Sequence, residues 1–80
     1  NVYPKEVETE IDEMPGVTES AVIGCPHPDF GEGVTAVVVV KPGATITAAS
    51  IAQTLEQRLA KFKLPKQVFI VDDLPRNTMG

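Results

Sequence analysis

Apolar side chains near the start of the chain recur at the spacing of a helix. Val7, Ile11 and Met14 are four and three positions apart, which places them on one face of an α-helix. Pro4 suits a first helical turn, and Pro15-Gly16 interrupts the pattern. The spacing therefore predicts a helix over residues 5–14.

Two short runs rich in β-branched residues follow. Val17–Gly24 is bounded by Gly and Pro, and Val34–Lys41 contains four consecutive valines. Such runs are typical of strands, and a run that is apolar on both faces indicates a central or doubly covered strand. The segment Cys25–Gly33 is dense in Pro and Gly, so we expect a loop there.

Helical spacing of apolar residues returns after Thr47, a residue type that caps helix N-termini. The apolar positions are Ile51, Leu55, Leu59 and Phe62. Pro65 is expected to end this helix, and Gln67–Val71 is predicted to be a third strand.

The predicted order of elements is α-β-β-α-β over a single domain, residues 1–80. This order indicates a small α+β domain in which helices pack against a three-stranded sheet. The handedness rule for crossover connections favours the third strand beside the first. Residues 72–80 are rich in Pro, Asn and Gly and are expected to form a loop.

Charge and composition exclude several function classes. The 80 residues include 7 Lys and Arg against 11 Asp and Glu, which gives a net charge of −4 and argues against nucleic-acid binding. The longest apolar run, Val34–Val40, is far shorter than the roughly 20 residues of a membrane span, so we expect no membrane partner. The single Cys25 excludes an internal disulfide and agrees with a cytoplasmic location.

Candidate catalytic chemistry is sparse. Cys25 and His27 lie two positions apart, but a zinc site needs four ligands and the sequence offers no others at a suitable spacing. As a nucleophile and base, the same two residues lack a third group that would orient them. The first predicted helix carries several carboxylates, which we interpret as a solvated face rather than an acid–base pair. They are Glu6, Glu8, Glu10, Asp12 and Glu13.

Basic residues gather where the second helix is predicted to end. Lys61, Lys63 and Lys66 interact favourably with a helix C-terminus, or they form an anion site with Phe62 as a platform for a ring. The residues alone leave both interpretations open.

The chain resembles the C-terminal domain of the adenylate-forming acyl-CoA synthetases. These enzymes belong to a superfamily that also includes luciferases and the adenylation domains of peptide synthetases. The opening and closing segments are most similar to the malonyl-CoA synthetase branch. The matching segments are Asn1–Glu8, Val17–Gly24, Gly31-Glu32, Phe62–Lys66 and Leu74–Gly80.

The resemblance implies part of an AMP-forming acid–CoA ligase that acts in fatty acid metabolism. A carboxylate and ATP would give an acyl-adenylate and pyrophosphate with Mg²⁺, and coenzyme A would then displace AMP. The large N-terminal adenylation domain is the implied partner, and the small domain would rotate between the two steps. The family lysine is expected directly after Gly80, so we expect the isolated chain to be inactive.

The resemblance also implies which residues serve the site. The loop that presents the lysine is Pro75, Arg76, Asn77, Thr78, Met79 and Gly80. Phe30 and Phe62 are expected to flank the CoA adenine, and Lys66 to meet a CoA phosphate. The family can carry Arg where this chain has Leu64, and Lys63 is a candidate to replace that contact. For Glu6 and Glu32 we favour structural roles.

Two alternatives remain. One is an adenylation domain of a peptide synthetase, which would transfer the acyl group to a carrier protein. The other is a non-catalytic α+β binding module. Adenine stacking is useful only with a CoA acceptor, so the aromatic pair favours CoA.

The resemblance also implies regulatory partners. The family lysine can be reversibly acetylated, which implies an acetyltransferase and a deacetylase. The expected docking surface consists of Arg76, Lys63 and Lys66.

Overall fold

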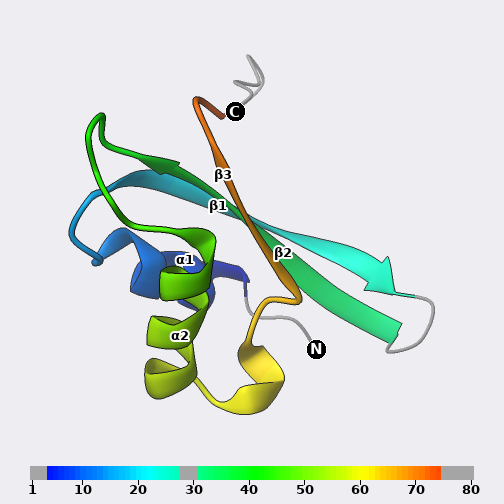
Figure 1. The fold of residues 1–80 in the computed structure, drawn as a ribbon. Coiled ribbons are helices and arrows are strands. Elements are labelled where there is room, and N and C mark those ends of the chain that lie inside the picture. The colour runs from blue at the N-terminus through cyan, green and yellow to red at the C-terminus, as the bar shows by residue number, and fades with distance from the viewer. Residues whose placement is uncertain (1–3, 28–30, 75–80) are drawn as a thin grey trace.

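The computed structural model describes residues 4–27 and 31–74, and of residues 25–27, 31 and 32 it describes the backbone alone. Within these residues the chain forms two α-helices, a three-stranded sheet and a short 3-10 helix (Figure 1). In chain order they are α1 (Pro4–Asp12), β1 (Val17–His27), β2 (Gly31–Val40), α2 (Ala48–Arg58), η1 (Lys61–Lys63) and β3 (Gln67–Val71). The predicted α+β class and the order of elements are confirmed.

β2 is the central strand of the sheet, as its run of valines predicts. It pairs antiparallel with β1 and parallel with β3, so the sheet is mixed. In this register Ala36 lies between Val22 of β1 and Val68 of β3. The prediction that the third strand lies beside the first is therefore wrong.

The outer edge of β1 is occupied by α1, which explains the strand order. The Val22 N–H donates a hydrogen bond to Glu8 Oε2 at 2.9 Å, and Ser20 Oγ donates to Asp12 Oδ1 at 2.7 Å. The first contact satisfies a backbone N–H of the strand edge that would otherwise attract another strand, and the second holds the end of α1 beside the same strand. The free edge of β2 is thus the one that receives β3.

The β1–β2 hairpin is longer than the sequence indicates. β1 continues through Pro26 to His27, and β2 begins at Gly31, so much of the predicted loop Cys25–Gly33 is strand. Pro26 of β1 lies opposite Glu32 of β2. β1 is an edge strand, and an edge strand tolerates proline because the missing N–H can face away from the hydrogen-bonded neighbour. Residues 28–30 lie outside the described part of the chain.

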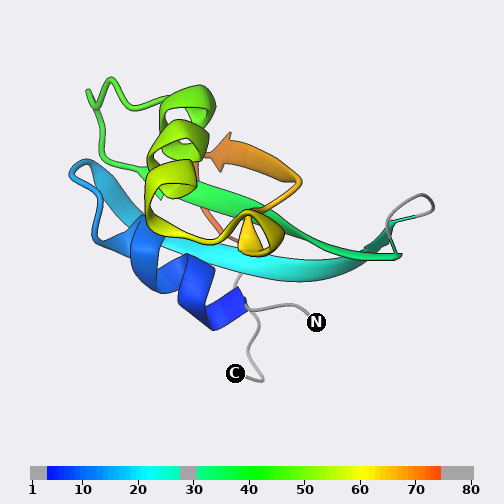
Figure 2. The ribbon, with the colours of Figure 1, turned by 90° about the horizontal axis from the view of Figure 1, so that it is seen from below.

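Both helices cover the same face of the sheet (Figure 2). Val7 and Ile11 of α1 and Ile51 and Leu55 of α2 have no exposed surface, which confirms the two predicted apolar faces. They form one hydrophobic core with buried strand residues. These strand residues are Val17, Val22, Val34, Ala36 and Val38.

α2 begins as predicted and ends earlier. Ser50 N–H donates to Thr47 Oγ1 at 3.1 Å and Thr47 N–H donates to Ser50 Oγ at 3.0 Å, a reciprocal cap that fixes the first turn. The helix ends at Arg58 because Leu59 is extended, with φ −121° and ψ 150°. Phe62 therefore does not continue the apolar face of the helix, and the longer helix predicted up to Pro65 is wrong.

Glu8→Ala is expected to open the hydrogen bond that protects the Val22 amide. Loss of a partly buried acceptor costs about 1–2 kcal/mol, so exchange of this amide with D₂O should become roughly 5- to 30-fold faster. Glu8→Gln keeps an acceptor oxygen and should have a smaller effect. The measurement is site-resolved hydrogen exchange, with Glu13→Ala, directly after the same helix, as the control. An unchanged Val22 rate in Glu8→Ala would show that the contact does not protect the edge.

Candidate functional site

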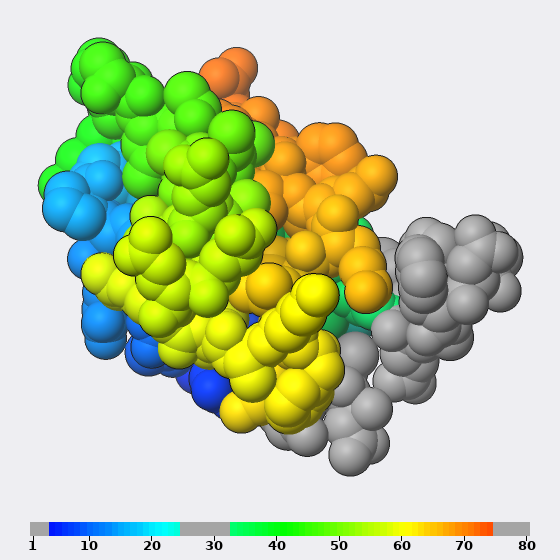
Figure 3. Space-filling view, turned by 60° about the horizontal axis from the view of Figure 1, so that its bottom comes forward, coloured from blue at the N-terminus to red at the C-terminus, as the bar shows by residue number. Residues whose placement is uncertain are grey.

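The segment between α2 and β3 carries the basic and aromatic residues that the sequence singles out. η1 has no side-chain cap and contains no buried residue, and Ala60 and Leu64 on either side of it are extended. The segment is fastened at its C-terminal end, where Leu64 packs against the core and Lys66 N–H donates to Val34 O at 2.8 Å. Figure 3 shows η1 (yellow) projecting from the molecular surface beside the first turn of α1 (dark blue).

Phe62 is the most exposed large apolar residue of the described part of the chain. Its relative exposure is 70%, against 48% for Phe69 on β3. A ring that stacks on a ligand must be exposed, and this requirement is met, whereas a core role for Phe62 is excluded. Its expected counterpart, Phe30, lies outside the described residues.

Lys63 points back toward α1. Its Nζ lies 3.0 Å from Glu6 Oε1 and 3.2 Å from Glu6 Oε2, and its side chain is only 23% exposed. The same Nζ lies over the Phe62 ring, 5.6 Å from the centroid, which is within the range of a cation–π contact. Lys63 is thus held between a carboxylate and the ring. This placement gives Glu6 the structural role that the sequence favours.

Lys66 lies across β2. A Cβ built on Gly33 would lie 2.8 Å from Lys66 Cγ, so the lysine stem occupies space that only glycine leaves open. Lys66 itself is exposed. Gly33 follows the Gly31-Glu32 pair that the sequence analysis singled out, and this contact brings that region of β2 next to the segment after η1.

A surface cavity that sequence reasoning missed lies where α2 meets η1. It has a volume of about 420 Å³ and is lined by Glu56, Leu59, Lys61 and Leu64. The cavity exists because α2 stops at Arg58 and the chain turns into η1. The apolar spacing conceals this turn, since it continues without a break through Phe62.

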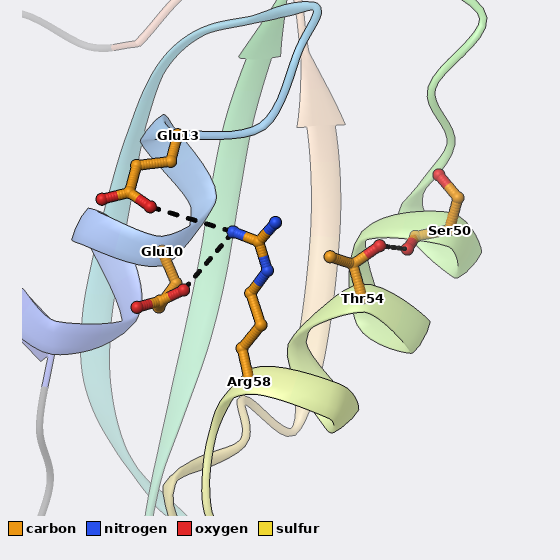
Figure 4. Close-up of polar contacts among 5 residues, drawn as sticks. All are labelled: Glu10, Glu13, Ser50, Thr54 and Arg58. Atoms are coloured by element: carbon orange, nitrogen blue, oxygen red, sulfur yellow. Dashed lines mark hydrogen bonds and ion pairs between the residues drawn. The ribbon is translucent and has the colours of Figure 1, made fainter.

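The carboxylates on and directly after α1 are exposed or half-buried, which agrees with their interpretation as a solvated face, and they have specific partners there. Arg58 Nη1 lies 3.5 Å from Glu10 of α1 and 3.9 Å from Glu13, directly after that helix, which ties α2 to this part of the chain (Figure 4). The Thr54 hydroxyl in the same view donates to the Ser50 carbonyl at 2.9 Å. Glu6 pairs with Lys63, Glu8 accepts from the Val22 N–H, and Asp12 accepts from the Ser20 hydroxyl. These contacts are structural, and none forms an acid–base pair.

Other predicted site residues lie beyond what the structure describes. The loop Pro75–Gly80 is outside the described residues, as are the side chains of Cys25, His27 and Glu32. Among the side chains that are described, no three of His, Cys, Asp and Glu gather closely enough to hold a metal ion. No described helix is long and apolar enough to cross a membrane.

Comparison with known proteins identifies the family. The model of the AMP-binding enzyme C-terminal domain matches residues 6–80. A (7a-methyl-1,5-dioxo-octahydro-1H-inden-4-yl)propanoyl:CoA ligase from Rhodococcus jostii is 49% identical, and an indoleacetate–CoA ligase from Aromatoleum aromaticum is 45% identical, each over all 80 residues of this chain. The chain spans only 16% of the length of these curated relatives.

Solved structures agree with this assignment. ATP-bound MatB from Rhodopseudomonas palustris has a TM-score of 0.92 and is 71% identical over the whole of this chain, which covers 16% of that protein. The fold and the sequence therefore point to the same family.

Gly33→Ala is expected to displace the Lys66 side chain and to leave the fold intact. The new methyl group would meet a flexible stem rather than backbone, so the free energy of unfolding should change by less than about 1 kcal/mol. The measurement is the nuclear Overhauser effect between the residue 33 α-proton and the Lys66 γ-protons, which should weaken. Thr35→Ala, on the same strand, is the control and should preserve it. An equally strong signal in Gly33→Ala would contradict the expected displacement.

Proposed function

The chain belongs to the family of AMP-binding enzyme C-terminal domains, and we propose that it is the mobile C-terminal domain of an ATP-dependent acyl-CoA ligase. The observation that carries the proposal is the exposed Phe62 ring on η1, close to lysines on an otherwise acidic domain. The CoA ligases among its relatives support the same acceptor.

The proposed reaction has two steps. The acid and ATP give an acyl-adenylate and pyrophosphate with the help of Mg²⁺, and the CoA thiol then displaces AMP. The large N-terminal domain would hold ATP and the acid. The loop Pro75–Gly80 would present the motif lysine, and a cation near the transferring phosphate offsets charge that develops in the transition state.

In the second step this domain would hold the nucleotide end of CoA. Phe62 offers a ring for stacking on adenine, with Phe30 as its proposed partner. Lys66 is exposed and carries the charge that a phosphate group attracts. Lys63 is less suited to the phosphate contact that Leu64 does not provide, because Glu6 neutralises it.

The acceptor distinguishes CoA ligases from peptide-synthetase adenylation domains. A carrier protein presents its thiol without an adenine, so an exposed stacking ring would serve no purpose there. A non-catalytic binding module is disfavoured for a different reason, because the matched relatives bear the names of ligases.

The finer proposal is a malonyl-CoA synthetase. It rests on the similarity of Asn1–Glu8 and Leu74–Gly80 to that branch, and the 71% identity makes MatB the reference for a comparison of acid substrates.

We also propose that the enzyme is cytoplasmic and that reversible acetylation of the motif lysine regulates it. On the proposed docking surface, Lys66 is exposed, whereas Lys63 is held by Glu6.

Phe62→Ala in the full-length enzyme is the experiment that tests the proposal. Base–aromatic stacking contributes about 1–3 kcal/mol, so the KM for CoA should rise roughly 5- to 150-fold. Adenylation, measured as pyrophosphate release without CoA, should be nearly unchanged because CoA takes no part in that step. Phe62→Tyr keeps a stacking ring and is the matched control. Equal damage to both half-reactions would show that Phe62 does not bind the acceptor.

A further inference from the structure

η1 carries the exposed Phe62 ring and contributes no buried side chain to the core. The element is three residues long, none of them buried, and no side chain caps it. Its own backbone bonds are short-range, from Lys63 N–H to Ala60 O at 2.9 Å and from Leu64 N–H to Lys61 O at 3.3 Å. A single turn of this kind is not stable by itself, so its orientation must depend on tertiary contacts.

The ion pair between Glu6 and Lys63 joins η1 to α1. Both carboxylate oxygens of Glu6 lie within 3.2 Å of Lys63 Nζ. Glu6 is well placed to anchor it because it lies in the first turn of α1, a helix whose Val7 and Ile11 are fully buried. The pair therefore connects an exposed turn to a helix that is anchored in the core.

The position of the ammonium also bears on the ring. Lys63 Nζ lies over the Phe62 ring, 5.6 Å from its centroid, and the residue remains 70% exposed. A cation on one face is attracted by the ring quadrupole and limits the rotation of the side chain. Glu6 fixes the cation, and the cation in turn fixes the ring.

We propose that Glu6 positions the adenine platform of the CoA site: its ion pair with Lys63 fixes η1 and thereby orients the Phe62 ring. This rests on the proposed function, since it assigns a positioning residue to the acceptor site. Lys63 is accordingly part of the support for the ring and not a ligand of a CoA phosphate.

The first test is Glu6→Gln in the full-length enzyme. An exposed ion pair contributes modestly, so the KM for CoA should rise about 2- to 5-fold, with kcat and the adenylation half-reaction unchanged. Glu10→Gln is the matched control, because Glu10 lies one turn further along α1 and pairs with Arg58 instead of η1. An equal rise in Glu10→Gln, or no rise in Glu6→Gln, would overturn the proposal.

The second test exchanges the charges. Glu6→Lys alone places two cations together and should weaken CoA binding more than Glu6→Gln. Glu6→Lys combined with Lys63→Glu restores an ion pair and should return the KM to within about twofold of the parent enzyme. If Lys63 instead binds a phosphate, a glutamate at that position repels CoA and the double variant will not recover, which would overturn the proposal.

A double-mutant cycle separates this inference from the proposed function. Glu6→Gln should have no further effect on the KM for CoA in a Phe62→Ala background, because Glu6 acts through the ring. An additive effect would overturn the positioning role and leave the stacking role intact. If Phe62→Ala alone leaves the KM for CoA unchanged, the stacking role itself fails, and the positioning role fails with it.

Discussion

The packing of two helices against one face of a small sheet is the constraint from which the other features follow. Val7 and Ile11 of α1 and Ile51 and Leu55 of α2 are buried in the same core. A chain of this size supports a single hydrophobic core, so both helices must share it. Because they share one face, their polar sides meet, and the carboxylates of α1 face the cations of α2 and η1. The ion pairs are a consequence of this arrangement rather than its cause, since exposed pairs contribute little stability.

Much of this core can be predicted from local spacing alone. The periodicity of Val7, Ile11 and Met14 reports which side of α1 is buried, and the run of valines in β2 indicates a central strand; the structure agrees with both. The position of β3 could not be predicted in the same way. It depends on α1 occupying the edge of β1, through contacts such as that of Glu8 with Val22, and nothing in the spacing of either element records that contact.

Local sequence patterns also predict only part of the candidate site. The basic and aromatic composition around Phe62 indicates a ligand surface, but the spacing of Leu59 and Phe62 also suits a continued helix. The extended backbone at Leu59 decides between the two, and it separates a buried leucine from an exposed phenylalanine. The partner of Lys63 is a residue at the opposite end of the chain, so composition could place the lysine in the cluster but could not reveal what it binds.

The absence of buried side chains in η1 has an evolutionary consequence. Residues 61–63 fill no volume in the core, so a substitution there leaves the packing density of the domain unchanged. Mutations that alter acceptor preference can therefore accumulate in this turn without being removed by selection for folding. The scaffold and the recognition surface are separable, and a lineage can diversify one while the other stays the same.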